Sequence, residues 1–269
     1  MKKKSLIITL IIILILQAIM PIKTNAFAEN REVTSTPAKI EKQKSKNTIF
    51  DDSITYKWEY HEEESLMAYG LYTPSNANEL ESVPMILYLH GSGETAVSED
   101  SLKSTGLPGV WDWEQWNLEN FSAYVLCPHL RDWNGSWQTG QAVSDVTELL
   151  EEIIAKYNID TENIVICGES RGGTGALYMA NIISKYFSKC VAFSAFYNGP
   201  FNTSMDTLCF YSYVADDASE YAGSWKSAFG EDKVFSLGCG HGSVGRVSLN
   251  SDEGKFERCW KCTVMVVLI

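Results

Sequence analysis

Histidine is scarce in this chain: only four of the 269 residues are histidine, at positions 61, 90, 129 and 241. Basic residues are also few, since 22 lysines and arginines stand against 34 aspartates and glutamates, for a formal net charge of -12. A protein that binds nucleic acid or an anionic lipid surface needs a basic face, so the charge argues against both partners. The shortage of histidine leaves few residues that can act as a general base near neutral pH.

Internal repeats and low-complexity tracts are absent from the sequence, and 45% of the residues are hydrophobic. This composition is typical of a globular protein rather than of a disordered one. The length suits one medium-sized domain with a complete hydrophobic core.

The N-terminus has the layout of a secretory signal peptide. Lysines at 2–4 precede an apolar run over 6–20, and the small residues Ala26 and Ala28 mark a cleavage site. No cysteine lies beside this site, which argues against lipid attachment there. The apolar run is short for a complete membrane span. We therefore expect a secreted, extracellular protein with no stable membrane association after cleavage; an uncleaved segment would instead hold the protein at the cell surface.

Three regions are predicted along the chain. Residues 1–28 form the signal peptide. Residues 29–50 are polar, carry charges of both signs and form a flexible linker. Residues 51–269 form a single folded domain.

The seven cysteines are an odd number, so at least one is unpaired in a monomer. Four of them lie in or at the end of strand-like apolar runs, namely Cys127, Cys167, Cys190 and Cys209. These four are expected to pack as small buried hydrophobic residues. Cys259 and Cys262 form a C-x-x-C pair, but no second pair with ligand spacing accompanies them. We expect a local disulfide or no function there, and no metal site.

Short apolar runs alternate with segments of helical periodicity. Strands are expected at 54–60, 66–72, 84–89, 121–127, 164–167, 191–193, 208–214 and 234–237. Helices are expected at 143–157, 174–185 and 219–229, with a turn over 158–163. Strands that alternate with helices predict an α/β fold, in which a mostly parallel sheet is covered by helices on both faces. Such a sheet binds ligands beyond the carboxyl ends of its strands.

The strongest local signal is Gly168-Glu169-Ser170-Arg171-Gly172, which fits the pattern G-x-S-x-G. An apolar strand precedes it and a helix follows it, the context in which this pattern carries the nucleophile of an α/β-hydrolase. Small residues two positions before and after the serine let strand and helix approach closely, and the sharp turn strains the backbone of the serine. The helix N-terminus also favours negative charge at the turn. Ser170 is therefore the predicted nucleophile.

A second glycine-rich turn, His90-Gly91-Ser92-Gly93-Glu94, directly follows the apolar strand 84–89. A turn at this point can direct a backbone N–H group into the site, where it joins the N–H of Arg171 as an oxyanion hole. Ser92 is the favoured donor and Gly93 the near alternative, although Gly91 and Ser92 could simply form a tight turn. His90 is expected to hold the loop through hydrogen bonds rather than to take part in chemistry.

The predicted base follows by elimination. Triad residues of α/β-hydrolases occur in the order serine, acid, histidine, and His241 is the only histidine after Ser170. Its loop, 238–242, follows the expected strand 234–237, where a base should approach the nucleophile. His241 would take the proton from Ser170 as the serine attacks a carbonyl group.

The acid of the triad is expected just beyond the strand 208–214, where Asp216 and Asp217 are adjacent. Side chains of neighbouring residues diverge, so only one of the two should reach the imidazole. Asp216 is favoured by its position just past the strand, and Asp217 is the alternative. Asp206 lies before the strand and should be at the wrong end of the sheet.

At these residues the chain resembles a group of α/β-hydrolases, the predicted phospholipase/carboxylesterase and feruloyl-esterase-like proteins, which are related to carbohydrate esterases and polyhydroxybutyrate depolymerases. The resemblance covers roughly residues 56–242. It depends on "YGLYTP" at 69–74, "LHGSGE" at 89–94, "LCPH" at 126–129, "KYNIDTENIVICGESRGGTGAL" at 156–177 and "GCGHGS" at 238–243. What it implies is ester hydrolysis by the triad named above, with no metal or organic cofactor.

Two features depart from that group. Arg171 stands where such proteins often carry methionine, and its side chain could point to solvent or contact the substrate. The segment 263–269 is apolar and β-branched where these folds usually finish with a helix, so it is expected to form a strand or an abnormal terminus. Exposed, such a run would favour aggregation.

The segment 107–137 should overhang the site, and it contains Trp111, Trp113, Trp116, Trp133 and Trp137. These tryptophans are expected either to line a sugar-stacking or acyl-binding pocket or to form a satellite hydrophobic cluster under a long loop. The substrate is then a small-molecule ester or an acylated polysaccharide. A secreted serine peptidase of the same fold and a non-catalytic binding protein on this fold are the alternatives.

Overall fold

A computed structural model of the chain describes residues 54–62, 67–92, 99–103, 122–130, 135–212 and 217–237. The predicted signal peptide and linker lie outside these residues, as do the C-x-x-C pair and the tail over 263–269, so these expectations stay predictions. No helix in the described ranges is long and apolar enough to cross a membrane.

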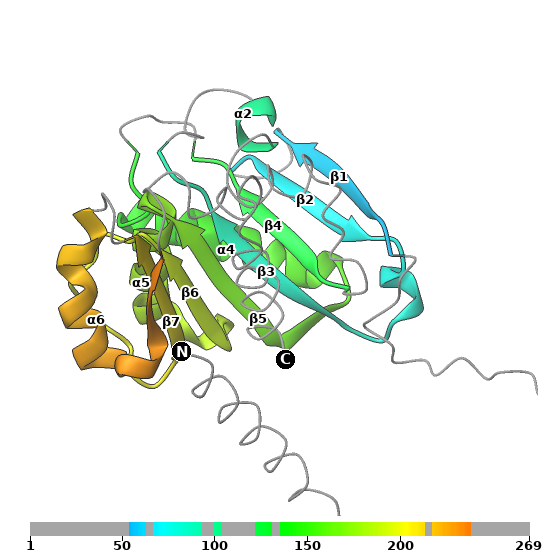
Figure 1. The fold of residues 1–269 in the computed structure, drawn as a ribbon. Helices are drawn as coiled ribbons and strands as arrows, with labels where there is room; N and C mark the ends of the chain where they lie inside the picture. Colours follow the sequence, from blue (N-terminus) through cyan, green and yellow to red (C-terminus); the bar gives the residue numbers. More distant parts are fainter. Residues whose placement is uncertain are drawn as a thin grey trace, which may run out of the picture. The chain divides into compact units, whose positions relative to one another are not determined.

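The described residues form an eight-stranded sheet with the order β1-β2-β4-β3-β5-β6-β7-β8 (Figure 1). Strand β1 runs antiparallel to β2, and β2 antiparallel to β4, whereas all the other neighbours run parallel. Their bounds are β1 Tyr56–His61, β2 Tyr69–Pro74, β3 Val83–Leu89, β4 Tyr124–Pro128, β5 Ile159–Glu169, β6 Lys189–Phe193, β7 Asp206–Ser212 and β8 Val234–Leu237. All eight predicted strands are confirmed, with ends that differ by a few residues.

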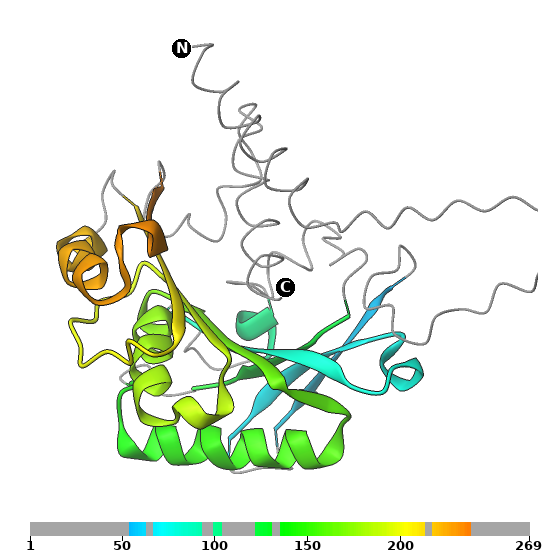
Figure 2. The ribbon, with the colours of Figure 1, turned by 90° about the horizontal axis from the view of Figure 1, so that it is seen from below.

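Helices pack on both faces of this sheet, as predicted. The α-helices are α2 Glu99–Lys103, α4 Gly140–Lys156, α5 Arg171–Ile182 and α6 Ala222–Phe229, and the 3-10 helices are η1 Ala77–Glu79, η2 Ser184–Tyr186, η3 Asp217–Tyr221 and η4 Glu231–Lys233. Residues of α4, α5 and α6 contribute to the larger core cluster, and Leu102 of α2 to the smaller one. In Figure 2, α4 and α2 lie on opposite sides of the strands.

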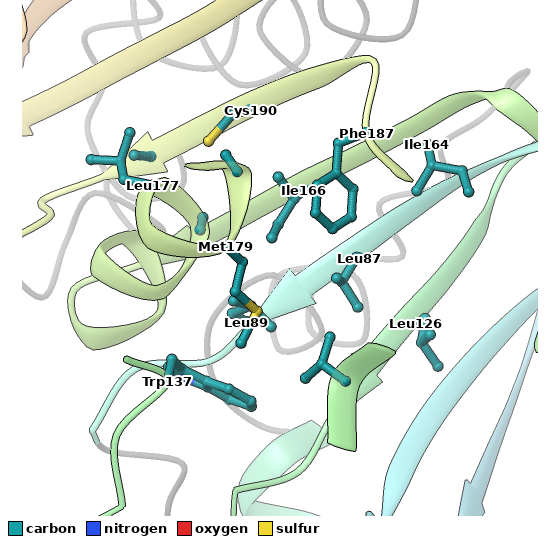
Figure 3. Close-up of a cluster of buried hydrophobic side chains, with 14 of the residues drawn as sticks. Leu87, Leu89, Leu126, Trp137, Ile164, Ile166, Leu177, Met179, Phe187 and Cys190 are labelled. Atoms are coloured by element: carbon teal, nitrogen blue, oxygen red, sulfur yellow. The ribbon is translucent and has the colours of Figure 1, made fainter. Parts of the chain in front are cut away.

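The larger core is built from the apolar runs of the central strands and the inner face of α5 (Figure 3). Leu87, Leu89, Leu126 and Ile166 have no exposed surface. Burying each such side chain contributes about 1.5–3 kcal/mol to folding. The core therefore holds strands β3 and β5 firmly beneath the loops that follow their carboxyl ends.

Helix α4 shows why the periodic segment folds as predicted. The Thr139 hydroxyl caps the N-terminus by accepting a hydrogen bond from the Ala142 N–H at 3.1 Å. Val146, Leu150 and Ile153 recur at helical spacing and are fully buried against the sheet. The helix begins three residues before the predicted start, because the cap lies upstream of the apolar stripe.

The predicted turn over 158–163 is only partly correct, because β5 already begins at Ile159. Ile159 pairs with Val83 and Ile164 with Met85, so the register shifts and the polar residues 160–163 bulge out between the two pairs. Within the bulge, the Asp160 carboxylate accepts hydrogen bonds from nearby residues, as in a turn. The partner residue at the shift is Pro84, which has no N–H to pair.

Candidate functional site

Ser170 occupies the sharp turn between β5 and α5, in the conformation expected of a nucleophile. Its backbone has φ 57° and ψ -116°, a left-handed conformation that costs a non-glycine residue about 1–3 kcal/mol. Hydrogen bonds hold it there: the Ser170 N–H donates to the Phe193 carbonyl at 2.8 Å, and the Thr174 N–H donates to the Ser170 carbonyl at 3.0 Å. Helix α5 thus begins at Arg171, three residues earlier than predicted.

The glycines around Ser170 are required by close backbone packing. A Cβ at Gly168 would lie 2.4 Å from the Gly172 carbonyl carbon, and a Cβ at Gly172 would lie 1.8 Å from the Leu89 carbonyl oxygen. A Cβ at Gly173 would lie 2.5 Å from the Phe193 carbonyl oxygen. The elbow therefore sits directly against the ends of β3 and β6, and no larger residue fits at these positions without moving backbone.

The turn after β3 is held by His90, as the sequence predicts. This side chain is fully buried, and its Nε2 accepts a hydrogen bond from the Leu130 N–H at 3.0 Å. The proton therefore resides on Nδ1, which donates to the Gly91 carbonyl at 2.7 Å. The pKa of His90 is lowered to about 3, chiefly by burial; the hydrogen bond to the Gly91 carbonyl opposes this shift, and the charges of His129 and Arg171 add to it. His90 is a neutral structural residue with both ring nitrogens engaged.

The two loops that carry the predicted oxyanion donors leave the sheet side by side. Leu89 of β3 pairs in register with Gly168 of β5, and both strands run parallel, so Ser92 and Arg171 follow at the same edge. Ser92 is half-buried, and the alternative donor Gly93 lies outside the described residues. The position of both loops agrees with an oxyanion hole, whose function stays a prediction.

The Arg171 side chain forms a contact that was not considered from the sequence. Its Nη1 donates to the Gly135 carbonyl at 2.9 Å, in the segment that precedes α4. The guanidinium group is half-buried rather than fully solvated. Arg171 therefore links the nucleophile turn to a neighbouring loop, which the sequence pattern alone does not reveal.

The strands that precede the predicted acid and base are neighbours at this same edge. Strands β7 and β8 are parallel, with Ser212 paired to Leu237 at their carboxyl ends. Asp216 and His241 lie outside the described residues, and so does the side chain of Asp217, whose backbone begins η3. The role of each stays a prediction.

Asp206 is the first residue of β7, at the opposite end of the sheet from Ser170, as predicted. Its carboxylate forms an ion pair with Lys233 at 2.7 Å. This pair joins the amino end of β7 to η4 and has no access to the nucleophile turn.

Trp137 belongs to the core rather than to a binding pocket. It is fully buried, its indole N–H donates to the His90 carbonyl at 3.0 Å, and it packs beside Leu89 (Figure 3). The other four tryptophans of the 107–137 segment lie outside the described residues. The four cysteines predicted to be buried are confirmed, namely Cys127, Cys167, Cys190 and Cys209.

Within the part of the chain that the structure describes, no group of three or more histidine, cysteine, aspartate or glutamate residues could hold a metal ion. The strand order, the parallel register and the strained serine between β5 and α5 define the α/β-hydrolase fold.

Comparison with known proteins agrees with this class. The family described as "Putative esterase" matches residues 109–236. A search of the curated proteins finds no significant match. A thermostable esterase has a similar structure, with a TM-score of 0.55 and 19% identity over 80% of this chain and 64% of that one. The chain thus spans less than two thirds of that esterase.

Two further structures are similar. One is a mutant feruloyl esterase module from Clostridium thermocellum in complex with sinapinate, with a TM-score of 0.54 and 14% identity over 82% of this chain and 92% of that one. The other is a Klebsiella pneumoniae protein described as a "Putative Dienelactone Hydrolase", with a TM-score of 0.56 and 12% identity over 80% and 98% of the two chains. The chain has the α/β-hydrolase fold, and its match to the esterase family model supports its assignment as a carboxylic ester hydrolase.

Proposed function

We propose that the protein is an exported serine esterase that cleaves carboxylic esters through an acyl-enzyme on Ser170. The observation that carries the proposal is the strained backbone of Ser170, held between β5 and α5 by glycines that no other residue can replace. Strain of this kind persists only where the surrounding structure enforces it, and it gathers at active sites.

In the proposed reaction, His241 accepts the hydroxyl proton of Ser170 as its Oγ attacks the ester carbonyl carbon. Backbone N–H groups of Ser92 and Arg171 stabilise the oxyanion of the tetrahedral intermediate. The intermediate expels the alcohol, which takes its proton from His241. Water, deprotonated by His241, then attacks the acyl-enzyme and releases the acid, returning the proton to Ser170. Asp216 orients the imidazole and stabilises its charged form.

The proposed substrates are small esters or the acyl groups of polysaccharides. Export through residues 1–28 would bring the enzyme to extracellular polymers. One structural neighbour is a feruloyl esterase module in complex with sinapinate, so hydroxycinnamate esters form a first panel to test beside acetyl esters. The same panel should include peptide substrates, which a serine peptidase of this fold would cleave.

The direct test is hydrolysis of a short-chain nitrophenyl ester by the mature protein and by Ser170→Ala. We expect turnover by the wild type and loss of about 10⁴-fold or more in the variant, because the nucleophile is removed. Ser188→Ala is the matched control, since Ser188 is exposed and its hydroxyl donates to the Ile164 carbonyl at the opposite end of the sheet. Equal rates for wild type and Ser170→Ala would refute the proposal.

The acid is identified by replacing Asp216 and Asp217 separately with asparagine. We expect only Asp216→Asn to be nearly inactive, and the reverse result would assign the role to Asp217.

Labelling by a fluorophosphonate probe should place the adduct on Ser170 alone. N-terminal sequencing of the protein recovered from the culture medium tests cleavage after Ala28.

A further inference from the structure

A short segment before α4 joins the two loops that are proposed to supply the oxyanion donors. At one end of this segment, which comprises residues 135–137, the Gly135 carbonyl accepts a hydrogen bond from Arg171 at 2.9 Å. At its other end, the Trp137 indole donates to the His90 carbonyl at 3.0 Å. Arg171 follows the nucleophile, and His90 begins the turn that contains Ser92. The segment therefore contacts both the first residue of α5 and the turn after β3.

The end of this connection formed by Trp137 and His90 is tightly packed and hydrogen-bonded. Trp137 is fully buried, and α5 packs closely against it, since a Cβ added at Gly175 would lie 2.4 Å from the Trp137 Cβ. His90 uses both ring nitrogens in hydrogen bonds to backbone groups of Gly91 and Leu130. A movement of the 135–137 segment would therefore pass directly to the turn after β3.

We propose that Arg171 is a positioning residue for the oxyanion hole, acting through its side chain in addition to its backbone N–H. The guanidinium group holds Gly135, the segment 135–137 holds the His90 carbonyl, and this sets the distance between the Ser92 and Arg171 N–H groups. The inference rests on the proposed esterase function. Donors of an oxyanion hole act only when they are fixed at the position where charge develops, so such a connection bears on kcat.

The test compares Arg171→Met, Arg171→Lys and Trp137→Phe in hydrolysis of a nitrophenyl ester, with kcat expressed per serine titrated by a fluorophosphonate. For Arg171→Met we expect a decrease in kcat of about tenfold, less than the roughly 100-fold or greater effect of losing a whole donor. KM should change by less than about twofold, since the proposal gives the side chain no direct contact with the substrate. Lysine can still donate to Gly135, so Arg171→Lys should recover kcat to within about threefold of wild type.

Trp137→Phe tests the hydrogen bond between Trp137 and the His90 carbonyl, because it removes the indole N–H and keeps an aromatic ring in the core. It should also lower kcat by several-fold, and its combination with Arg171→Met should lose little more than the worse single variant, since both act on one segment. Trp225→Phe is the matched control: Trp225 is equally buried and its indole donates to the Tyr197 carbonyl at 2.8 Å, away from these loops. It should leave kcat per titrated serine unchanged.

Three results would overturn the proposal: wild-type kcat in Arg171→Met, a rise in KM at constant kcat, or losses in the two single variants that multiply in the double variant. If Arg171→Met does not fold, Trp137→Phe and Arg171→Lys still decide the question. Failure of the esterase function is recognised separately, because the wild type would then neither hydrolyse the ester nor react with the probe at Ser170.

Discussion

The contact between the nucleophile elbow and strand β3 sets a strict limit on the size of residue 172. A methyl group at this position would lie 1.8 Å from the Leu89 carbonyl oxygen, 2.5 Å from its carbonyl carbon and 2.7 Å from the His90 carbonyl oxygen. Ordinary contact begins near 3.4 Å, so Gly172→Ala requires the end of β3 and the elbow to separate by roughly 1.5 Å. All three contacting atoms are backbone, so no side chain can move away to relieve the clash.

The loss of stability caused by Gly172→Ala should exceed the loss caused by a typical overpacked side chain. Overpacking that side chains can accommodate costs about 1–3 kcal/mol, and here the paired residues Leu89 and Gly168 must also shift. We expect Gly172→Ala to lower the free energy of unfolding by about 3 kcal/mol, a large share of the roughly 5–15 kcal/mol typical of a folded domain. The proposed esterase activity should fall as well, because the turn after β3 moves with Leu89.

Urea unfolding followed by tryptophan fluorescence measures this change, provided that the transition is two-state. Gly223→Ala is the matched control, since no heavy atom lies within 4 Å of its added Cβ and the residue is in helix α6. Alanine should stabilise that helix by about 0.5–1 kcal/mol. The two substitutions thus have opposite predicted signs. A Gly172→Ala protein as stable as the wild type would refute the close packing of the elbow.

Two further predictions concern buried titratable groups. The pKa of His90 falls from its ordinary 6.5 to about 3 on folding, so the unfolded chain binds more protons between these values and stability decreases as the pH falls. Between pH 7 and pH 4.5 the free energy of unfolding should fall by about 2–3 kcal/mol more in the wild type than in His90→Gln. Equal decreases in the two proteins, measured by urea titration, would contradict the burial of a neutral imidazole. Burial also raises the pKa of the Cys167, Cys190 and Cys209 thiols, so iodoacetamide should modify none of them in the folded protein by mass spectrometry. Rapid alkylation without denaturant would show that these strands open.

Much of the fold is predictable because the central strands are buried on both faces. The run 84–89 is almost purely apolar and appears as β3, where every residue from Val83 to Leu89 is buried. Helix α4 was predictable because its apolar stripe has the helical period. In both cases the burial that stabilises the element also leaves a pattern in the sequence.

Features that depend on contacts between distant segments leave no such pattern. Residues 160–163 favour a turn by composition, yet β5 continues past them because Ile159 pairs with Val83 from another part of the chain. The hydrogen bond from Arg171 to Gly135 joins residues 36 positions apart, and nothing in either local sequence indicates it. The burial of Trp137 could not be predicted either, since a tryptophan just before a helix can line a pocket or pack in a core.

The candidate site also combines features that have a local sequence pattern with features that depend on contacts between distant segments. Ser170 was predictable from a five-residue pattern, because the close approach of strand and helix requires glycines at fixed positions around the serine. The function of His90 also follows from its place directly after a buried strand. The pairing of acid and base depends on loops that meet only in three dimensions, so sequence order narrows the choice to Asp216 or Asp217 and goes no further.

The surroundings of the other three histidines bear on the proposal that His241 is the base. His90 has both ring nitrogens in hydrogen bonds, and the Nδ1 of His129 lies 2.8 Å from the Tyr60 hydroxyl. His61 ends β1, which is separated from β5 by three strands, or roughly 19 Å at the usual spacing of about 4.8 Å.

His241 follows Leu237 by four residues, and a chain of that length spans up to about 14 Å, close to the distance of three strand spacings between β8 and β5. We expect His241→Gln to lower ester hydrolysis by about 10⁴-fold or more, because the serine then has no base. His61→Gln, the control at the far edge of the sheet, should retain wild-type kcat. Substantial activity in His241→Gln would mean that the proton of Ser170 leaves by another route and would refute the proposed triad.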